Sequence, residues 1–187
     1  MNAVPVPQFA LHHTGLLVRD VEQAATHYAR TMGYVIESAA IEDPVQTAWV
    51  KFLRLPGARN WLELVAPNGP KSRLTAALAK GGGVHHVCYE VADIAGAVAQ
   101  FRESGFMVLS EPVDAVAFPG RRIAWVMDRQ RFLVELLEAG PGVLSLSSLE
   151  NNQYEFSQPT SPADDFPRGV RSTEPPTDSR AQPGHAA

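Results

Sequence analysis

Two histidines and two glutamates are the residues of this sequence whose types and spacing best suit metal binding. His13 and Glu63 are 50 residues apart, and His86 and Glu135 are 49 residues apart, so the same pair occurs twice. Both glutamates lie in strongly apolar runs, where a carboxylate is costly to bury unless it is paired or binds a metal. Two imidazoles and two carboxylates suit one divalent ion such as Zn, Ni, Co, Mn or Fe(II). An octahedral ion would keep two positions for water or a bidentate substrate.

These four residues occupy matching positions of an internal sequence repeat. Residues 13–20 share a pattern with residues 86–93, and residues 61–65 share one with residues 133–137. The offset shortens from 73 to 72 residues after the first predicted helix. Taken alone, such a histidine is more often a hydrogen-bonded core residue, and such a glutamate is more often solvated. The repeat favours the metal site, because core packing gives no reason to place the same costly residues twice.

Each repeat unit has the pattern of one strand, one helix and three strands. The first unit predicts a strand over 11–18, a helix capped by Asp20 and ended by Gly33, and strands over 34–39, 47–55 and 60–65. The second unit predicts a strand over 84–91, a helix from Asp93 to about Ser104, and strands near 107–110, 122–128 and 131–137. A short linking helix is expected over 72–80. The sequence therefore predicts an α+β fold made of two tandem βαβββ modules.

The domain plan that follows has five parts. We expect an extended lead-in over 1–8, a first module over 9–67, a linking segment over 68–81, a second module over 82–139 and a tail over 140–187. The tail is polar, contains seven prolines and has almost no periodic apolar pattern. Such a segment buries too little surface to offset the entropy of ordering, so the tail is predicted to be disordered.

Composition excludes several classes of function. The formal net charge is −4 and no run approaches the roughly 20 apolar residues of a membrane span, so neither nucleic acid nor a membrane is an expected partner. The first residues lack the pattern of a signal peptide, and the single cysteine, Cys88, cannot form an internal disulfide. These features predict a cytoplasmic protein in which Cys88 is a small core residue.

At the repeated residues the sequence resembles the vicinal oxygen chelate superfamily, which includes glyoxalase I, extradiol dioxygenases, fosfomycin-resistance proteins and methylmalonyl-CoA epimerases. The resemblance covers about residues 10–139 and is greatest to the epimerases. The motifs that carry it are Glu63-Leu-Val-Ala-Pro67, Val84-His85-His86-Val-Cys-Tyr-Glu90, Gly120-Arg-Arg-Ile-Ala-Trp125 and Leu133-Val-Glu135-Leu. It implies a curved, mostly antiparallel sheet around a metal-binding cleft, and a homodimer.

The resemblance also implies the site residues. It assigns the metal ligands to His13, Glu63, His86 and Glu135. The two histidines of this set are each the second residue of a His-His pair. Because side chains alternate along a strand, the preceding histidines, at 12 and 85, are expected on the opposite face.

The implied chemistry is removal of a proton next to a chelated carbonyl through an enediolate, with a small-molecule substrate such as an acyl thioester. Glu135 is the first candidate for the base, and Glu63 is its repeat-related partner. The epimerases have a further catalytic carboxylate on the strand that corresponds to 47–55, which here contains Lys51 and no acidic residue. Lys51 is therefore a candidate to neutralise a substrate carboxylate or enolate, the alternative being a solvated strand residue.

Three classes of function remain open at this point. The first is proton transfer by a metal-dependent epimerase, isomerase or glyoxalase-like lyase. The second is an Fe(II) dioxygenase, which typically uses two histidines and one carboxylate, so a fourth ligand argues against it. The third is a protein that sequesters a small molecule without chemistry, as resistance proteins do. Such a protein has no need of all four ligands.

Overall fold

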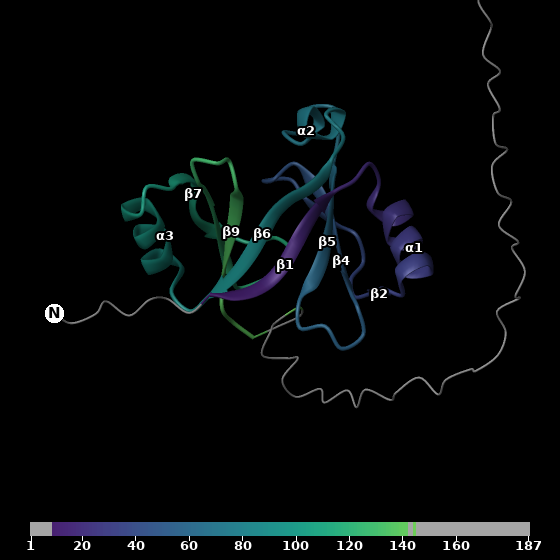
Figure 1. The fold of residues 1–187 in the computed structure, drawn as a ribbon, viewed down its shortest axis with the longest axis horizontal. Helices are drawn as coiled ribbons and strands as arrows, with labels where there is room; N and C mark the ends of the chain where they lie inside the picture. The colour runs from purple at the N-terminus through teal and green to yellow at the C-terminus, as the bar shows by residue number, and fades with distance from the viewer. Residues whose placement is uncertain (1–8, 142–143, 145–187) are drawn as a thin grey trace, which may run out of the picture. The chain divides into compact units, whose positions relative to one another are not determined.

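The computed structural model describes residues 9–141 and residue 144 of the chain (Figure 1). The first module contains β1 (Ala10–Leu17), α1 (Val21–Met32), β2 (Val35–Ile36), β3 (Ile41–Asp43), β4 (Ala48–Arg54) and β5 (Trp61–Pro67). The rest contains α2 (Thr75–Ala79), β6 (Gly83–Val91), α3 (Ile94–Glu103), β7 (Met107–Asp114), β8 (Arg122–Met127) and β9 (Leu133–Glu138). The predictions for the lead-in and for almost all of the tail lie outside the described residues.

In the described part of the chain, the strands form one sheet in which the two modules meet through β1 and β6. The order is β2-β4-β5-β1-β6-β9-β8-β7, and β3 pairs with β4. β1 and β6 are antiparallel, β5 is parallel to β1, and β9 is parallel to β6. All other described pairs are antiparallel. The predicted α+β class with a mostly antiparallel sheet is confirmed.

The two long helices begin as the sequence predicts. The side chain of Asp20 accepts hydrogen bonds from the backbone N–H groups of the first turn of α1, which ends at Gly33 in a left-handed conformation (φ 75°). Asp93 caps α3 in the same way, by accepting from the N–H of Gly96. α1 lies at one end of the sheet and α3 at the other (Figure 1). The repeat therefore extends to the way each helix starts.

Alternation along the strands gives each half of the sheet a helix-covered face and an opposite face. On β5, Leu62 and Leu64 pack in the cluster that includes α1, whereas Trp61 and Val65 belong to a central apolar cluster on the other face. Glu63 lies between these last two positions, so it shares their face. The same holds on β9, where residues 134 and 136 pack with α3 and residues 135 and 137 do not.

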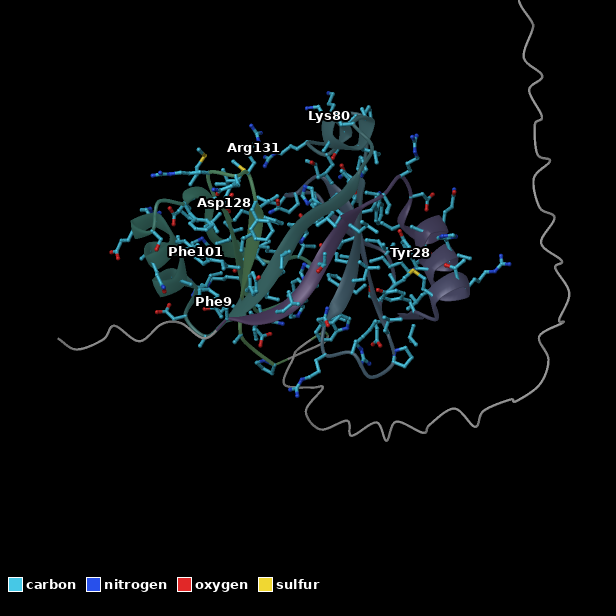
Figure 2. All side chains as sticks on the ribbon, viewed as in Figure 1. Phe9, Tyr28, Lys80, Phe101, Asp128 and Arg131 are labelled. Atoms are coloured by element: carbon cyan, nitrogen blue, oxygen red, sulfur yellow. The ribbon has the colours of Figure 1, made fainter. Side chains whose placement is uncertain are left out.

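The helix-covered faces are packed by aromatic residues at equivalent repeat positions. Phe101 on α3 packs edge-to-face against Phe9, with ring centroids 5.5 Å apart (Figure 2). Tyr28, its equivalent on α1, contacts Tyr34 with centroids 6.2 Å apart (Figure 2). These contacts hold each helix on its own half-sheet and leave the opposite face to the central cluster.

The predicted strand over 34–39 is wrong in its extent. Only Val35–Ile36 pairs with β4, and the chain returns to β4 as β3 over Ile41–Asp43. Between β2 and β3, the N–H of Phe52 on β4 donates to the hydroxyl of Ser38 at 3.0 Å and not to a backbone carbonyl. This bond interrupts the ladder along β4. The linking helix is also shorter than expected, at five residues. In the described part of the chain, no helix is long and apolar enough to cross a bilayer.

A glycine on β1 makes room for one of the repeated histidines. Gly15 pairs with His86 across the β1–β6 ladder, and a Cβ built on Gly15 would lie 2.1 Å from Cε1 of the imidazole. No real contact is that short, so a side chain at this position must push the ring of His86 out of place.

We therefore expect Gly15→Ala to lower the melting temperature, by an amount that corresponds to about 1–3 kcal/mol of overpacking, and to abolish divalent-metal binding. Gly69→Ala is the matched control, because a Cβ on Gly69 meets nothing within 4 Å. Thermal unfolding and zinc titration of both variants test this. Equal behaviour of the two variants would show that the ring of His86 is not confined by Gly15.

Candidate metal centre

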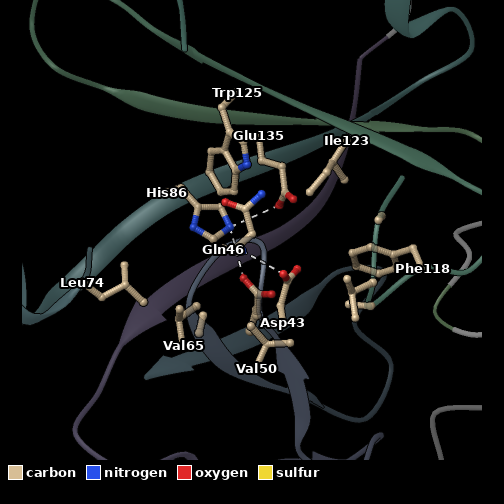
Figure 3. A pocket seen from close by; sticks show the side chains of 15 residues that line it. Asp43, Gln46, Val50, Val65, Leu74, His86, Phe118, Ile123, Trp125 and Glu135 are labelled. Carbon is tan, nitrogen blue, oxygen red and sulfur yellow. Dashed lines mark hydrogen bonds and ion pairs between the residues drawn. The ribbon is translucent and has the colours of Figure 1, made fainter. Parts of the chain in front are cut away.

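Four side chains from four neighbouring strands converge at the centre of the sheet. They are His13 on β1, Glu63 on β5, His86 on β6 and Glu135 on β9, and one ligand atom of each lies within 4.8 Å of the others. Nε2 of His13 lies 3.4 Å from Oε2 of Glu63 and 3.0 Å from Oε2 of Glu135. Nε2 of His86 lies 3.1 Å and 3.3 Å from the same two oxygens (Figure 3). The two Nε2 atoms are 3.1 Å apart.

A bulge in β1 brings a third imidazole to the same face. In the β1–β6 ladder Leu11 pairs with Tyr89 and His13 pairs with Cys88, which leaves His12 as an extra residue. The bulge turns the ring of His12 toward that of His13, and their Nδ1 atoms are 2.8 Å apart. The prediction that His12 faces away is wrong, because a regular alternation of side chains does not cross a bulge.

β6 has the equivalent bulge one position before its own ligand histidine. Gly15 pairs with His86 and Leu16 pairs with Val84, so His85 is the extra residue. Nδ1 of His85 lies 2.9 Å from Nδ1 of His86. The prediction for His85 is wrong for the same reason, and each candidate ligand has an imidazole behind it.

Charge balance holds the four central groups in their ionised forms. Burial alone would raise the pKa of Glu63 and Glu135, but the two imidazoles lower both values well below the usual range. Burial alone would lower the pKa of His86, but hydrogen bonds to the two carboxylates raise it to about 9. The pKa of His13 is also raised, mainly by the charge of Glu63. Two carboxylates and positive charge between them are therefore the stable arrangement.

The imidazoles of His12 and His85 have lowered pKa values, and the thiol of Cys88 has a raised one. Burial and the neighbouring ligand histidines lower the pKa of His12 to about 3 and that of His85 to about 4, so both rings are neutral at neutral pH. Burial, followed by the charge of Glu135, raises the pKa of Cys88 well above its ordinary value. A buried, protonated thiol agrees with the expectation of an unreactive core residue.

The donor set fits a divalent ion. Two neutral imidazoles and two carboxylates are ligands that zinc and similar ions prefer, and ligand atoms about 2.1 Å from one ion lie roughly 3.0–3.4 Å from each other. The measured separations between the imidazole nitrogens and the carboxylate oxygens span the same interval, 3.0–3.4 Å. An ion at this point would replace the protons of the two imidazoles as the positive charge between the carboxylates.

The structure does not bring Lys51 to these four residues. On β4, Val50 and Phe52 belong to the central cluster, so Lys51 lies on the face covered by α1. Its Nζ is 2.9 Å from Oε1 of Glu22 on that helix. The predicted catalytic position is wrong because one step along a strand reverses the face, and the alternative of a solvated residue is wrong too, since only 8% of the Lys51 side chain is exposed.

A cavity of about 70 Å³ opens beside these residues and is lined by groups that sequence reasoning missed (Figure 3). Asp43 from β3 and Gln46 reach it from the first module, and Phe118 and Trp125 reach it from the second. Asp43 is 6% exposed, and its Oδ1 accepts a hydrogen bond from the N–H of Gln46 at 2.8 Å. Asp43 is thus a third buried carboxylate on this cavity, besides Glu63 and Glu135.

The repeat contained a signal for these positions. The offset of 72 residues carries Asp43 to Ala115 and Gln46 to Phe118, and all four residues line the same cavity. Because the residue types differ between the modules, the sequence similarity that reveals the histidines and glutamates does not reveal these positions. Asp43 falls between the strands predicted over 34–39 and 47–55, whereas in the structure it is the last residue of β3.

Comparisons with known proteins agree with this geometry. A family model described as the glyoxalase/bleomycin resistance protein/dioxygenase superfamily matches residues 12–125. An ethylmalonyl-CoA/methylmalonyl-CoA epimerase of Cereibacter sphaeroides is 34% identical over 130 residues, which cover 67% of this chain and 95% of that protein. A Streptomyces coelicolor methylmalonyl-CoA epimerase in complex with 2-nitronate-propionyl-CoA is 26% identical, with a TM-score of 0.62, over 70% of this chain and 97% of that one. A methylmalonyl-CoA epimerase in complex with methylmalonyl-CoA and NH4+ is 26% identical, with a TM-score of 0.63, over 73% and 98%.

The raised pKa values predict opposite pH dependences for the metal-free and the metal-bound protein. The pKa of His86 rises from 6.5 to about 9 on folding, so the stability from this proton is present below pH 6.5 and is lost as pH rises through 9. A metal ion competes with that proton, so its stabilising effect grows over the same interval. We expect the melting temperature to fall from pH 6.5 to 9 without metal, and the shift caused by zinc to increase.

Differential scanning calorimetry with a chelator or with Zn²⁺ measures both trends. His86→Ala should show a smaller fall without metal, because only His13 still binds a proton there, and almost no zinc-induced shift. His27→Ala, on the exposed side of α1, should behave as the wild type. A zinc-induced shift that is constant from pH 6.5 to 9 would contradict the exchange of protons for metal.

Proposed function

The chain belongs to the glyoxalase/bleomycin resistance protein/dioxygenase superfamily, and from this premise we propose that it is a divalent-metal-dependent epimerase of 2-substituted malonyl thioesters. The observation that carries the proposal is that Glu63, His86 and Glu135 of the candidate metal centre line one cavity together with a further buried carboxylate, Asp43. Relatives named as methylmalonyl-CoA epimerases match 67% and 70% of the chain. One of them is in complex with methylmalonyl-CoA, which supports an acyl thioester as the substrate class.

His13, Glu63, His86 and Glu135 are the residues that would hold the ion. When bound, a divalent ion would polarise the chelated carbonyl groups of the substrate and so acidify the proton on the carbon between them. The remaining work belongs to side chains of this chain, which must orient the substrate, exclude water and carry the proton.

Glu135 is the proposed base. Its Oε2 faces both imidazoles, and the apolar strand around it leaves the residue 4% exposed. A carboxylate held at the metal centre is close to any substrate chelated there, and its second oxygen is available to take the proton. Glu63, its repeat-related partner, has the same contacts from β5 and is proposed mainly as a ligand.

Asp43 is the proposed second proton carrier. An epimerase must remove a proton from one face of the carbon and return one to the other, which calls for groups that approach from different directions. Asp43 comes from β3 and Glu135 from β9, on opposite modules, and both line the cavity (Figure 3). The apolar side chains of Val50, Val65 and Ile123 line the same cavity and suit the alkyl branch of the acyl group.

We expect Glu135→Gln to lose on the order of 10²-fold or more in α-proton exchange of the epimer whose proton faces Glu135, because it keeps an oxygen donor but removes the base. The assay follows deuterium uptake from D₂O into methylmalonyl-CoA by NMR, with zinc or cobalt added. Glu138→Gln, which changes an Arg122-paired residue farther along β9, is the control and should keep its rate. Glu63→Gln should weaken metal binding with a smaller effect per bound ion. The absence of exchange in the metal-loaded wild type would contradict the proposal and favour an oxygenase or a sequestering protein.

Asp43→Asn separates the two proton transfers. With one carrier removed, we expect epimerisation to slow by roughly 10²-fold. Deuterium exchange into one epimer, which needs only Glu135, should stay within several-fold of the wild type. Glu42→Gln, the exposed neighbour on β3, is the control. Equal loss of exchange from both epimers in Asp43→Asn, with metal still bound, would contradict this division of roles.

A further inference from the structure

Both ring nitrogens of His12 have a partner inside the protein. Nδ1 lies 2.8 Å from Nδ1 of His13, and Nε2 lies 2.7 Å from the backbone oxygen of Leu144. The side chain of His12 is 0% exposed, and its ring packs against Trp61 and Phe118 at centroid separations of 4.8 Å and 5.2 Å. The ring is therefore closed off from water, and these two contacts account for both of its nitrogens.

The carbonyl of Leu144 sets the direction of the two hydrogen bonds. A carbonyl has no proton to donate, so Nε2 of His12 carries the hydrogen of the 2.7 Å bond. A second proton on Nδ1 would make the ring a cation, and neither of its polar partners is an anion. An unpaired cation is costly in a dry, aromatic site. Nδ1 of His12 is then the acceptor, and Nδ1 of His13 is the donor.

We propose that His12 is a positioning residue, which holds the proton of His13 on Nδ1 and leaves the lone pair on Nε2, the nitrogen that faces Glu63 and Glu135. The inference rests on the proposed metal site. A neutral imidazole has one lone pair, and only a ring with its lone pair on Nε2 can bind an ion between these carboxylates. Hydrogen bonds from behind a ligand histidine fix its orientation and raise its basicity. Here the backbone carbonyl of Leu144, which follows β9 in the chain, fixes the tautomer of His12.

The second module has no equivalent anchor. Nδ1 of His85 lies 2.9 Å from Nδ1 of His86, but within 9–141 and 144 no backbone carbonyl accepts a hydrogen bond from the ring of His85. His85 is half-buried, so its ring can act as donor or acceptor and does not impose one tautomer on His86. The two ligand histidines are thus unequal, and His12 has the larger effect on metal binding.

Zinc binding to two variants distinguishes this role from packing. His12→Phe fills the space of the imidazole but offers no acceptor, whereas His12→Asn is smaller and keeps an amide oxygen that can accept from His13. We expect His12→Phe to weaken Zn²⁺ affinity about 10- to 100-fold, and His12→Asn to stay within roughly threefold of the wild type. A packing role predicts the reverse order. His85→Phe should lose less Zn²⁺ affinity than His12→Phe does. His27→Phe, on the surface of α1, should keep the affinity of the wild type. Competition with a chromophoric chelator measures the affinities.

Histidine ¹⁵N NMR of the zinc-loaded wild type tests the tautomers directly, and does so even where His12→Phe does not fold. The expected spectrum places the proton of His12 on Nε2 and that of His13 on Nδ1. A proton on Nδ1 of His12 would overturn the proposal, as would an unchanged zinc affinity in folded His12→Phe. A wild-type protein that takes up no zinc would instead refute the metal site and, with it, the proposed function.

Discussion

The burial of two carboxylates at the centre of one sheet is the constraint on which the rest of the structure depends. Glu63 and Glu135 are 6% and 4% exposed and lie on strands that are apolar apart from them and from Glu138 at the end of β9. Ions in such a place lose hydration worth several kcal/mol each, which the fold must offset with positive charge and hydrogen bonds. His13 and His86 supply the positive charge and the hydrogen bonds, and a divalent ion between the four side chains would add further positive charge. A sheet that placed either glutamate without its imidazoles would be strongly destabilised.

The pseudo-symmetric sheet provides this arrangement from one plan used twice. β1 and β6 run antiparallel through the centre, and each has a glutamate-bearing strand parallel to it on its outer side. Cys88 lies opposite His13, and Gly15 lies opposite His86, where a Cβ would clash with the ring. The bulges then place a second histidine behind each ligand. The modules differ at Asp43 and at the hydrogen bond from His12 to Leu144, neither of which has an equivalent in the second module among the described residues.

Much of this could be predicted from the sequence, because the repeat, the helix caps and the apolar alternation are local signals. They predicted the fold class, the starts of α1 and α3 and the four residues that the structure brings together. The faces of His12, His85 and Lys51 could not be derived in this way, since one inserted residue or one step along a strand reverses a face. Asp43 was missed because its chemistry has no counterpart in the second module. The homodimer and the cytoplasmic location stay predictions.

The function proposed here depends on one claim, that the four central residues bind a single divalent ion. Isothermal titration of the metal-free protein with Zn²⁺, compared with His86→Ala and Glu135→Ala, tests that claim most directly. The account predicts one tight site per chain in the wild type and the loss of most binding in both variants. A wild-type protein without stoichiometric binding, or variants that bind as tightly as the wild type, would contradict it.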